Sequence, residues 1–529
     1  MPIIGKNYIG YSQSAKGSGS FHSFVPAQAS YLAEKFHPAT PDEVEEAMQK
    51  AEDAFDAYAA VPAHKRAEFL LAITEEIMGM GDELLERAHL ETGLPMARLQ
   101  GERARTINQI TQFADLIREG SWVEASVDTA QPDRAPAPKP DLRKMLVPIG
   151  PIVVFGSSNF PFAYSIAGVD TGPALAAGNP VIVKAHPAHP GVSDLTAQAI
   201  VKAAQRTGMP DGVFSMLYDD KYEVGTALVK NPHTKAVGFT GSFKGGMALY
   251  KMAQERDEPI PVFSEMGSVN PIVILPKTMA AQTDTLAKTL ASSVTLGAGQ
   301  FCTNPGLVFV VKSPELAQFE ANYAQEISKV TSATMLTEGI RINFFKLRDE
   351  ALEQAGVESL AMSDVATEDR NQSQASIARV SGQAFISNPK LHEEVFGPFS
   401  LLVVSETVAE MQEAVSKLSG QLTTSLMADA EEAKEYPQLV RILARRAGRF
   451  IMNGAPTGVE VCASMHHGGP FPSTTDSRFT SVGRHAILRF VRPQSFQDWP
   501  QSMLPDELKD SNPLNVWRLV DNEWTQSAV

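Results

Sequence analysis

One of the chain's cysteines lies among small and turn-forming residues, where a thiol can face a cleft. Cys302 occurs in the run Gly-Gln-Phe-Cys-Thr-Asn-Pro-Gly at 299–306. In such surroundings an accessible thiolate is a nucleophile. A buried and inert cysteine is the alternative when this residue is taken alone, because most free cysteines behave as small hydrophobic residues.

Two further polar residues follow apolar, strand-like runs. Glu265 precedes Met266-Gly267, and Asn159 follows the run Phe-Gly-Ser-Ser at 155–158. A carboxylate at the first position could act as a general base toward water, and an amide at the second could donate to a developing oxyanion. A solvated glutamate and a turn asparagine are the alternatives. Each residue alone is therefore ambiguous.

Three segments offer contacts to a nucleotide. Lys184 ends the run Val-Ile-Val-Lys, and Gly241-Ser242 open a helix after a strand. Such a turn can present N–H groups to a pyrophosphate, although its spacing is not G-x-G-x-x-G. Glu394 and Phe396 put an acid and an aromatic before a proline turn that could meet ribose hydroxyls. The alternative for that segment is a surface acid before a turn.

His186 and His189 form an H-x-x-H pattern in a proline-containing segment. Proline prevents their regular presentation on a helix, and no cysteine is nearby in the sequence. We interpret them as solvated loop histidines and predict no metal site.

The elements that must position these residues follow from hydrophobic periodicity. Thr40-Pro41-Asp42-Glu43 predicts a helix start with a capping box, and further helices are expected at 63–77, 81–92 and 98–118. The opening third of the chain is thus expected to be a helical layer, followed at 120–150 by an extended, proline-rich arm.

Short apolar runs then alternate with helical segments, which predicts a parallel, doubly wound α/β sheet. The expected strands of this sheet are 152–155, 181–184, 213–217 and 236–239. A second α/β lobe is expected from the strands 271–275, 307–311 and 401–404.

Composition narrows the classes of protein and partner. The chain has 529 residues, which is too long for one hydrophobic core, and it has no apolar run long enough to cross a bilayer. A net charge of -15 argues against nucleic acid as a partner and favours a small molecule. Two cysteines, Cys302 and Cys462, and a start unlike a signal peptide predict a reducing, cytoplasmic location.

Taken together, six motifs in order resemble the aldehyde dehydrogenase superfamily: S-N-F-P, V-I-V-K, F-T-G-S, E-M-G-S, G-Q-F-C and E-V-F-G-P. The resemblance covers nearly the whole chain. It implies a Rossmann-type NAD(P)-binding domain at 1–126 and 149–267 and an α/β catalytic domain at 268–483. It also implies a β oligomerisation arm at 127–148 and 484–500, with a strand near 486–491, and leaves a C-terminal tail at 501–529. A homodimer or homotetramer is expected.

The resemblance also assigns roles. It implies Cys302 as the nucleophile that forms a thioester, Glu265 as the general base and Asn159 as an oxyanion donor. Lys184 would contact the adenosine ribose and Glu394 the nicotinamide ribose, with Gly241, Ser242 and Phe396 completing the cofactor contacts.

We expect NADP as the cofactor, with NAD as the alternative. Relatives that prefer NAD often carry a glutamate three residues after the strand-end lysine, where it would repel a 2′-phosphate. That position is Pro187 here, so no acid is expected to compete with the phosphate.

The chain departs from the family where many relatives carry P-F-G-G-x-K-x-S-G, because residues 466–478 read His-His-Gly-Gly-Pro-Phe-Pro-Ser-Thr-Thr-Asp-Ser-Arg. With 453–461, this ending resembles a bacterial branch containing 2,5-dioxopentanoate dehydrogenases and a fatty-aldehyde dehydrogenase. We expect 2,5-dioxopentanoate as the substrate, with Arg105 and Arg478 as candidates to bind its carboxylate.

Three other functions remain as alternatives. Fatty or other aliphatic aldehydes would want an apolar tunnel, which Phe160 and Phe301 could line. A catalytically silent binding protein with this fold and an acylating enzyme that uses coenzyme A are less favoured, because both Cys302 and Glu265 are retained.

Overall fold

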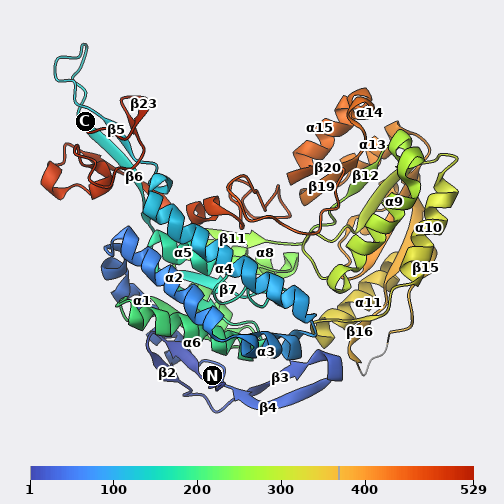
Figure 1. The fold of residues 1–529 in the computed structure, drawn as a ribbon, viewed down its shortest axis with the longest axis horizontal. Helices are drawn as coiled ribbons and strands as arrows, with labels where there is room; N and C mark the ends of the chain where they lie inside the picture. Colours follow the sequence, from blue (N-terminus) through green and yellow to red (C-terminus); the bar gives the residue numbers. More distant parts are fainter. Residues whose placement is uncertain (1, 367–369) are drawn as a thin grey trace.

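The computed structural model describes residues 2–366 and 370–529. Two seven-stranded sheets form separate lobes, and a five-stranded sheet projects from the first of them (Figure 1). No helix within the described ranges is both long and apolar enough to cross a membrane.

The first sheet has the strand order β11-β10-β7-β8-β9-β1-β2. Its strands are β1 (Asn7–Ile9), β2 (Ser12–Ser14), β7 (Ile152–Phe155), β8 (Val181–Lys184), β9 (Phe214–Leu217), β10 (Ala236–Thr240) and β11 (Val262–Glu265). The five strands from β7 to β11 are parallel, as the alternation of strands and helices predicts. Polar residues that follow β7, β8, β10 and β11 therefore meet at one edge of the sheet.

Helices cover both faces of this sheet. They are α1 (Pro41–Ala59), α2 (Ala63–Gly79), α3 (Asp82–Thr92), α4 (Met96–Glu119), α5 (Thr171–Ala177), α6 (Pro190–Arg206), α7 (Glu223–Lys230) and α8 (Phe243–Gln254). The predicted capping box is confirmed, since the Thr40 hydroxyl accepts from the Glu43 N–H and the Thr40 N–H donates to the Glu43 carboxylate.

The opening segment differs from its prediction as part of a helical layer. Before α1 it forms β1, β2 and a hairpin of β3 (Phe21–Val25) and β4 (Ser30–Phe36). β1 and β2 have only three residues each, and β1 pairs with β9 and so extends the first sheet. Tertiary pairing therefore decides their structure.

The second sheet has the strand order β15-β17-β18-β13-β12-β19-β20. Its strands are β12 (Ile272–Ile274), β13 (Leu307–Val311), β15 (Glu358–Met362), β17 (Ser376–Ser381), β18 (Phe399–Ser405), β19 (Gln421–Met427) and β20 (Ala447–Met452). A small separate pair joins β14 (Ala333–Thr334) to β16 (Gln372–Ser373).

Helices also cover both faces of the second sheet. They are α9 (Pro276–Thr295), α10 (Leu316–Ser328), α11 (Glu338–Leu352), α12 (Gly382–Ser387), α13 (Val408–Ser416), α14 (Ala430–Glu435) and α15 (Pro437–Arg446). Along β13, Leu307 and Phe309 pack into one apolar cluster, while Val308 and Val310 pack into another. This burial of both faces explains why the sequence of β13 is an uninterrupted apolar run.

The projecting sheet has the order β21-β6-β5-β22-β23. Its strands are β5 (Ser126–Asp128), β6 (Leu142–Pro148), β21 (Val491–Gln497), β22 (Arg518–Val520) and β23 (Glu523–Thr525). We call it the arm sheet. The last two strands come from the segment that the sequence analysis treats as a tail.

The predicted position of the strand near 486–491 is wrong. Residues Arg484–Phe490 form a 3-10 segment, and the strand that pairs with β6 begins at Val491. Ala486, Ile487 and Phe490 are instead buried in the core of the first lobe, just before the strand that the resemblance implies.

Candidate active site

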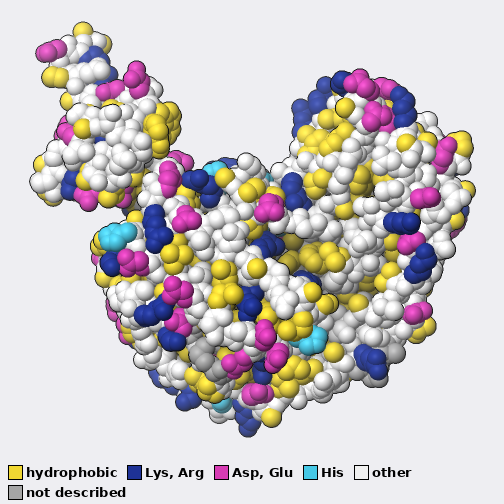
Figure 2. All heavy atoms as spheres, viewed as in Figure 1, with side chains coloured by type: hydrophobic (Ala, Val, Ile, Leu, Met, Phe, Trp, Pro, Cys, Tyr) yellow, Lys and Arg dark blue, Asp and Glu magenta, His cyan; other side chains and the backbone are white. Residues whose placement is uncertain are grey.

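Three of the predicted residues reach the region between the lobes from different elements. Glu265 is the last residue of β11, Asn159 follows β7, and Cys302 follows α9 and a short 3-10 turn. The Asn159 amide donates to the Gln300 carbonyl at 3.1 Å, two residues before Cys302. Asn159 and Glu265 are buried, and Cys302 is partly buried. Figure 2 shows the molecular surface hollowed between the two lobes.

A histidine joins the cysteine and the glutamate. His467 Nε2 lies 3.4 Å from Cys302 Sγ and 2.9 Å from Glu265 Oε1. The other oxygen of Glu265 accepts from the Ser481 hydroxyl at 2.6 Å. One imidazole nitrogen thus contacts both the candidate nucleophile and the candidate base.

The segment that carries His467 is held against β11. Glu265 and Thr474 form an antiparallel bridge, and the Met266 N–H donates to the Ser473 carbonyl at 2.7 Å. The His467 N–H donates to the Thr480 hydroxyl at 2.9 Å. The segment in which this sequence departs from the family pattern therefore builds one side of the candidate site.

The ionisable groups of this cluster change one another's pKa values. Burial, followed by the neighbouring Glu265 carboxylate, raises the pKa of the Cys302 thiol well above its ordinary value. Burial also opposes ionisation of Glu265, but His467 and the Ser481 hydroxyl hold the pKa of its carboxyl below its ordinary value. The thiol at rest is therefore protonated beside an ionised glutamate, and it needs a proton acceptor before it can attack.

The backbone around Cys302 is fixed by close contacts. The Asn270 amide donates to the carbonyls of Cys302 at 2.8 Å and Asn304 at 3.0 Å. Gly299 has φ +64, and a Cβ there would lie 2.3 Å from the Gly397 carbonyl group. Only glycine fits this position, where the two motifs meet.

Arg98 on α4 connects the loops that carry Asn159 and Cys302. Its Nη2 donates to the Asn159 carbonyl at 2.7 Å, and its guanidinium lies 4.5 Å from the ring centre of Phe301 and 5.1 Å from that of Phe160. The first lobe thus supports both catalytic loops.

Lys184 occupies the end of β8 in a buried site. Its ammonium donates to the Asp219 carbonyl at 2.9 Å, and burial lowers the pKa of Lys184 while Asp219 and Asp220 oppose that change. Two acids thus lie close to this lysine, although the position that carries a glutamate in NAD-preferring relatives is Pro187 here. Sequence analysis considered only the segment after β8, whereas both acids follow the neighbouring strand β9.

The start of α8 carries the predicted glycine-rich turn. The Ser242 hydroxyl caps this helix by accepting from the Gly245 N–H at 3.2 Å. A Cβ on Gly241 would lie 2.6 Å from the Phe239 ring, so the turn needs glycine. The turn and Lys184 follow strands of one sheet, which fits a dinucleotide lying across the strand ends.

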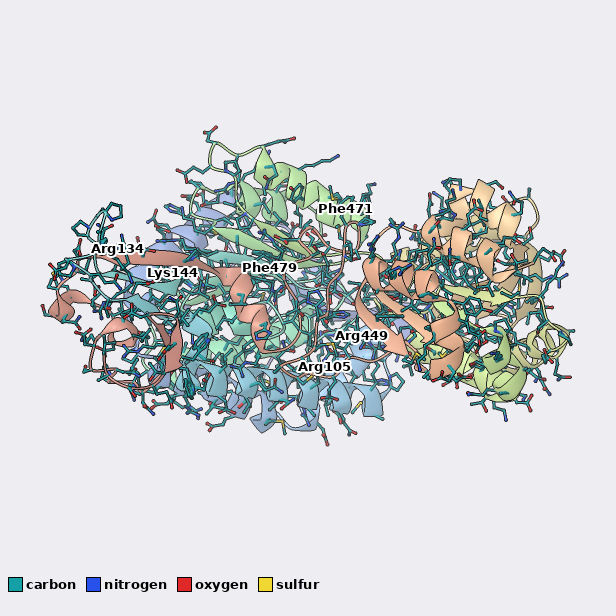
Figure 3. The ribbon with its side chains drawn as sticks, turned by 90° about the horizontal axis from the view of Figure 1, so that it is seen from above. Arg105, Arg134, Lys144, Arg449, Phe471 and Phe479 are labelled. Carbon is teal, nitrogen blue, oxygen red and sulfur yellow. The ribbon has the colours of Figure 1, made fainter. Side chains whose placement is uncertain are left out.

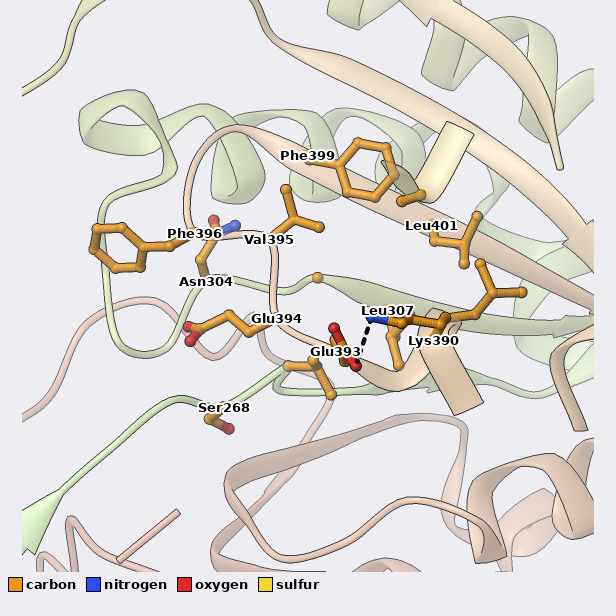
Figure 4. A pocket seen from close by; sticks show the side chains of 14 residues that line it. Ser268, Asn304, Leu307, Lys390, Glu393, Glu394, Val395, Phe396, Phe399 and Leu401 are labelled. Atoms are coloured by element: carbon orange, nitrogen blue, oxygen red, sulfur yellow. Dashed lines mark ion pairs between the residues drawn. The ribbon is translucent and has the colours of Figure 1, made fainter. Parts of the chain in front are cut away.

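Glu394 and Phe396 line a pocket together with Ser268 and Asn304 (Figure 4). Burial raises the pKa of Glu394 to about 7. A Cβ on Gly267 would lie 2.3 Å from the Glu394 carboxylate, so the E-M-G-S motif allows this acid to approach. An acid at this place fits a contact to ribose hydroxyls.

The interpretation of His186 and His189 as solvated loop residues is wrong. His189 is fully buried and its Nε2 lies 2.8 Å from the Ser157 carbonyl, while the two rings stack with centres 5.8 Å apart. Burial is the main cause that lowers the pKa of both rings. They pack between the turns that follow β7 and β8.

The two predicted substrate arginines lie in different surroundings. Arg105, on α4, has its guanidinium 5.7 Å from the Phe160 ring centre. Arg478 has a side chain that is 79% exposed and pairs with Asp476. The ring centres of Phe160 and Phe301 lie 5.6 Å apart. The structure thus brings Arg105 and both phenylalanines together, whereas the Arg478 guanidinium is already neutralised at the surface.

The sequence motifs include neither His467 nor Ser481, and they do not include Arg449, whose pKa is influenced by the charges of Cys302 and Tyr164. His467 stands in a segment that was recognised as unusual, and a histidine before two glycines was the available signal. Arg449 lies within β20, and nothing in its local pattern distinguishes it from an ordinary strand residue.

Comparison with known proteins decides the family. The aldehyde dehydrogenase family model matches residues 13–495. This chain belongs to the aldehyde dehydrogenase family. The protein is therefore an aldehyde dehydrogenase. Enzymes of this family use NAD or NADP as the cofactor.

Two curated relatives span the whole length of this aldehyde dehydrogenase. Alpha-ketoglutaric semialdehyde dehydrogenase 2 from Azospirillum brasilense is 48% identical over 99% of this chain and all of the relative. Alpha-ketoglutaric semialdehyde dehydrogenase from Acinetobacter baylyi is 42% identical over 99% of each chain. The predicted branch resemblance is confirmed.

Solved aldehyde dehydrogenase structures confirm the predicted fold class. Gamma-glutamyl-gamma-aminobutyraldehyde dehydrogenase from Burkholderia cenocepacia matches with a TM-score of 0.79 and 20% identity, covering 94% of this chain and 97% of that one. 1-Pyrroline-5-carboxylate dehydrogenase from Thermus with bound NAD matches with the same TM-score of 0.79 and 20% identity, over 93% of this chain and 92% of that one.

Proposed function

We propose that this enzyme oxidises 2,5-dioxopentanoate to 2-oxoglutarate through a thioester on Cys302. For the chemistry, the supporting observation is the buried contact of Cys302, His467 and Glu265. For the substrate, support comes from two relatives at 48% and 42% identity, both named for alpha-ketoglutaric semialdehyde.

Acylation begins when the thiol loses its proton. With its own proton on Nδ1, His467 accepts the thiol proton at Nε2, 3.4 Å away, and the new Nε2–H of the imidazolium then lies between the thiolate and the Glu265 carboxylate. Without a cation there, two negative charges would face each other in a buried site. The thiolate attacks the aldehyde carbon, and the Asn159 amide and the Cys302 N–H hold the resulting oxyanion.

Deacylation needs a base and a water molecule. A bound nicotinamide supplies the acceptor for the hydride that the tetrahedral adduct expels, and a thioester on Cys302 remains. Glu265 takes a proton from water, the hydroxide attacks the thioester carbonyl, and the Cys302 thiolate leaves. The acid is released, His467 returns to the thiolate the proton that it took during acylation, and Glu265 gives its proton to solvent.

The substrate is tested by comparing kcat/KM for 2,5-dioxopentanoate with kcat/KM for uncharged aldehydes of increasing chain length. We expect the acidic substrate to have the highest value. A higher value for long aliphatic aldehydes would favour the fatty-aldehyde alternative, and strict dependence on coenzyme A would favour the acylating one.

Replacing His467 with glutamine is expected to lower kcat/KM at neutral pH by about 100-fold, because the thiol loses its proton acceptor. The acidic limb of the pH profile should move to higher pH, since a thiol of raised pKa reaches its thiolate form only there. The measurement is kcat/KM against pH, with iodoacetamide labelling of Cys302 over the same range.

The exposed His485 provides the matched control, and His485→Gln should keep the wild-type profile. An unchanged profile in His467→Gln would show that His467 does not activate the thiol.

We propose that the enzyme prefers NADP to NAD. Pro187 brings no charge to the ribose site, and the Asp219 carboxylate is engaged by the N–H groups of Lys221 at 2.8 Å and Val224 at 3.1 Å. Initial rates should give a higher kcat/KM with NADP. Pro187→Glu should lower that value about tenfold more for NADP than for NAD, because it adds a negative charge beside the 2′-phosphate. A wild-type preference for NAD would contradict this proposal.

We also propose that the chain assembles as a homodimer or homotetramer through the arm sheet. β21 and β23 form the two edges of that sheet, and the large exposed apolar side chains of the arm region include Trp499 and Met503 after β21 and Trp517 and Trp524 at β22 and β23. Exposed strand edges need partners. Light scattering should give a multiple of 57.2 kDa, and the monomer mass at working concentration would contradict assembly.

We retain the predicted domain boundaries as a proposal. The change from the first sheet to the second falls between Glu265 and Ile272, which supports a boundary after residue 267. The strands β22 and β23 support counting part of 501–529 with the arm rather than as a free tail.

A further inference from the structure

Arg105 is a cation without an anionic partner inside the candidate site. Within residues 2–366 and 370–529, its buried Nε and Nη2 atoms have no hydrogen-bond partner. Its guanidinium instead faces the rings of Phe160 at 5.7 Å and Tyr164 at 5.6 Å. A buried guanidinium edge with free donors is costly unless a ligand completes it.

Glu102, the acid nearest to it in sequence on α4, is engaged elsewhere. One oxygen of its carboxylate accepts the N–H groups of Phe162 at 2.8 Å and Ala163 at 3.0 Å. Burial raises the pKa of Glu102, although Arg98 and Arg105 oppose that change. The other oxygen of Glu102 is buried and has no hydrogen-bond partner among the described residues, so Glu102 holds the turn after Asn159 and makes no hydrogen bond to Arg105.

Arg449 offers one further donor from the other lobe. Its Nη1 and Nη2 donate to the carbonyls of Gly458 at 2.9 Å and Pro456 at 2.6 Å, which fix the guanidinium in place. Its Nε is buried and has no hydrogen-bond partner among the described residues. Figure 3 shows Arg449, from β20, in the same central region as Arg105, from α4.

Both arginines act on the same reacting group. The positive charge of Arg105 opposes the rise in the pKa of Cys302, and the Cys302 and Tyr164 charges oppose the lowering of the pKa of Arg449 by burial. The walls between them are apolar, because Phe160, Tyr164 and Val461 belong to one cluster with Phe301 packed against it. The surroundings of the thiol therefore include two guanidinium groups and an apolar cluster.

We infer that Arg105 and Arg449 form a subsite for a 2-oxo carboxylate. The Nε–Nη2 edge of Arg105 binds the carboxylate with two hydrogen bonds, and Nε of Arg449 donates to the 2-oxo oxygen. This inference rests on the proposed function, because the aldehyde at the other end of the ligand meets Cys302. In this subsite Arg449 takes the place of Arg478, which the sequence suggested as the second arginine that binds the substrate.

The chemistry of the ligand matches the free donors. A planar carboxylate accepts two parallel hydrogen bonds from a guanidinium edge, and a ketone oxygen accepts a single N–H. Four carbon–carbon bonds separate the aldehyde carbon from the carboxylate carbon in 2,5-dioxopentanoate, which is roughly 5 Å in extended form. A short ligand with a carboxylate and a 2-oxo group can use the thiol and both guanidinium groups, whereas a long apolar chain leaves the free donors of the arginines unsatisfied.

Three five-carbon aldehydes distinguish the effect of the carboxylate contact from that of the 2-oxo contact. Pentanal has neither polar group, 5-oxopentanoate adds the carboxylate, and 2,5-dioxopentanoate adds the 2-oxo group. For the wild-type enzyme, kcat/KM should rise at each step. Arg105→Met should reduce the gain from the carboxylate by about 10- to 100-fold, and Arg449→Met should reduce the gain from the 2-oxo group by about tenfold.

Pentanal serves as the internal reference, because an effect of a variant on the thiol changes kcat/KM for all three aldehydes together, so each gain is expressed relative to the kcat/KM for pentanal in the same variant. Arg445→Met, which removes an exposed charge on α15, is the matched control and should keep all three values. Arg105→Lys keeps the positive charge but cannot form two parallel hydrogen bonds, so the gain in kcat/KM from the carboxylate should fall by less than in Arg105→Met. Calorimetry should show weaker binding of 2-oxoglutarate to both methionine variants.

The possible failures are distinguishable. If the wild-type enzyme favours pentanal, the proposed function itself is wrong. If it favours 2,5-dioxopentanoate but Arg105→Met and Arg449→Met keep the wild-type ratios, or lower all three values equally, the subsite is wrong and the proposed function stands.

Discussion

Replacing Cys302 with alanine is expected to lower aldehyde oxidation by roughly 10⁴-fold or more while cofactor binding stays nearly unchanged. The thiol forms the covalent bond to the aldehyde carbon, and no other group in the cluster can replace it. His467 and Glu265 hold each other at 2.9 Å, so the alanine variant keeps the rest of the site. The measurements are kcat/KM for the aldehyde and the dissociation constant of the dinucleotide.

Cys462 supplies the control for this experiment. It is the other cysteine of the chain, and Cys462→Ala should oxidise aldehydes at close to the wild-type rate. Substantial residual oxidation in Cys302→Ala would exclude the thioester mechanism.

Glu265→Gln is expected to slow turnover by 10²- to 10⁴-fold, with the acyl-enzyme accumulating. The amide keeps the shape of the carboxylate and its contacts to His467 and Ser481, but it cannot take a proton from water. Hydride transfer precedes the step that needs this base. Rapid mixing should therefore show a burst of reduced nicotinamide, and mass spectrometry should show the thioester on Cys302.

Glu255→Gln is a matched control, because Glu255 is an exposed acid at the end of α8. It should give normal turnover and no accumulated adduct. Slow turnover of Glu265→Gln without a burst or an adduct would show that Glu265 acts before the thioester forms.

The strands that place the site could be predicted from sequence because both of their faces are buried. The predicted strands 152–155, 181–184 and 307–311 have the same bounds in the structure. Long apolar runs of β-branched residues bounded by turn residues leave few other structures. The strands before α1 are different, because their partners are supplied by β9 and by each other.

Some residues of the site could be found from local sequence motifs, and others could not. Asn159 and Glu265 lie at the ends of strands that the sequence suggests, and together with Cys302 they stand in recognisable motifs. His467 and Arg449 reach the cluster from a loop and a strand more than 140 residues away along the chain from Cys302. Their importance depends on the bridge between Glu265 and Thr474 and on the approach of β20, which no local pattern describes. Contacts between distant segments were therefore the information that the sequence lacked.

The arm sheet has a consequence for the order of events during synthesis. β5 pairs in parallel with β22, and the Thr129 hydroxyl donates to the Asp521 carboxylate at 2.6 Å across 392 residues of chain. The ribosome must translate every strand and helix of both lobes before β22 emerges. Subunits that join through a completed arm therefore do so only after both lobes have been made. A nascent chain has no finished arm to offer its neighbours on the same messenger RNA.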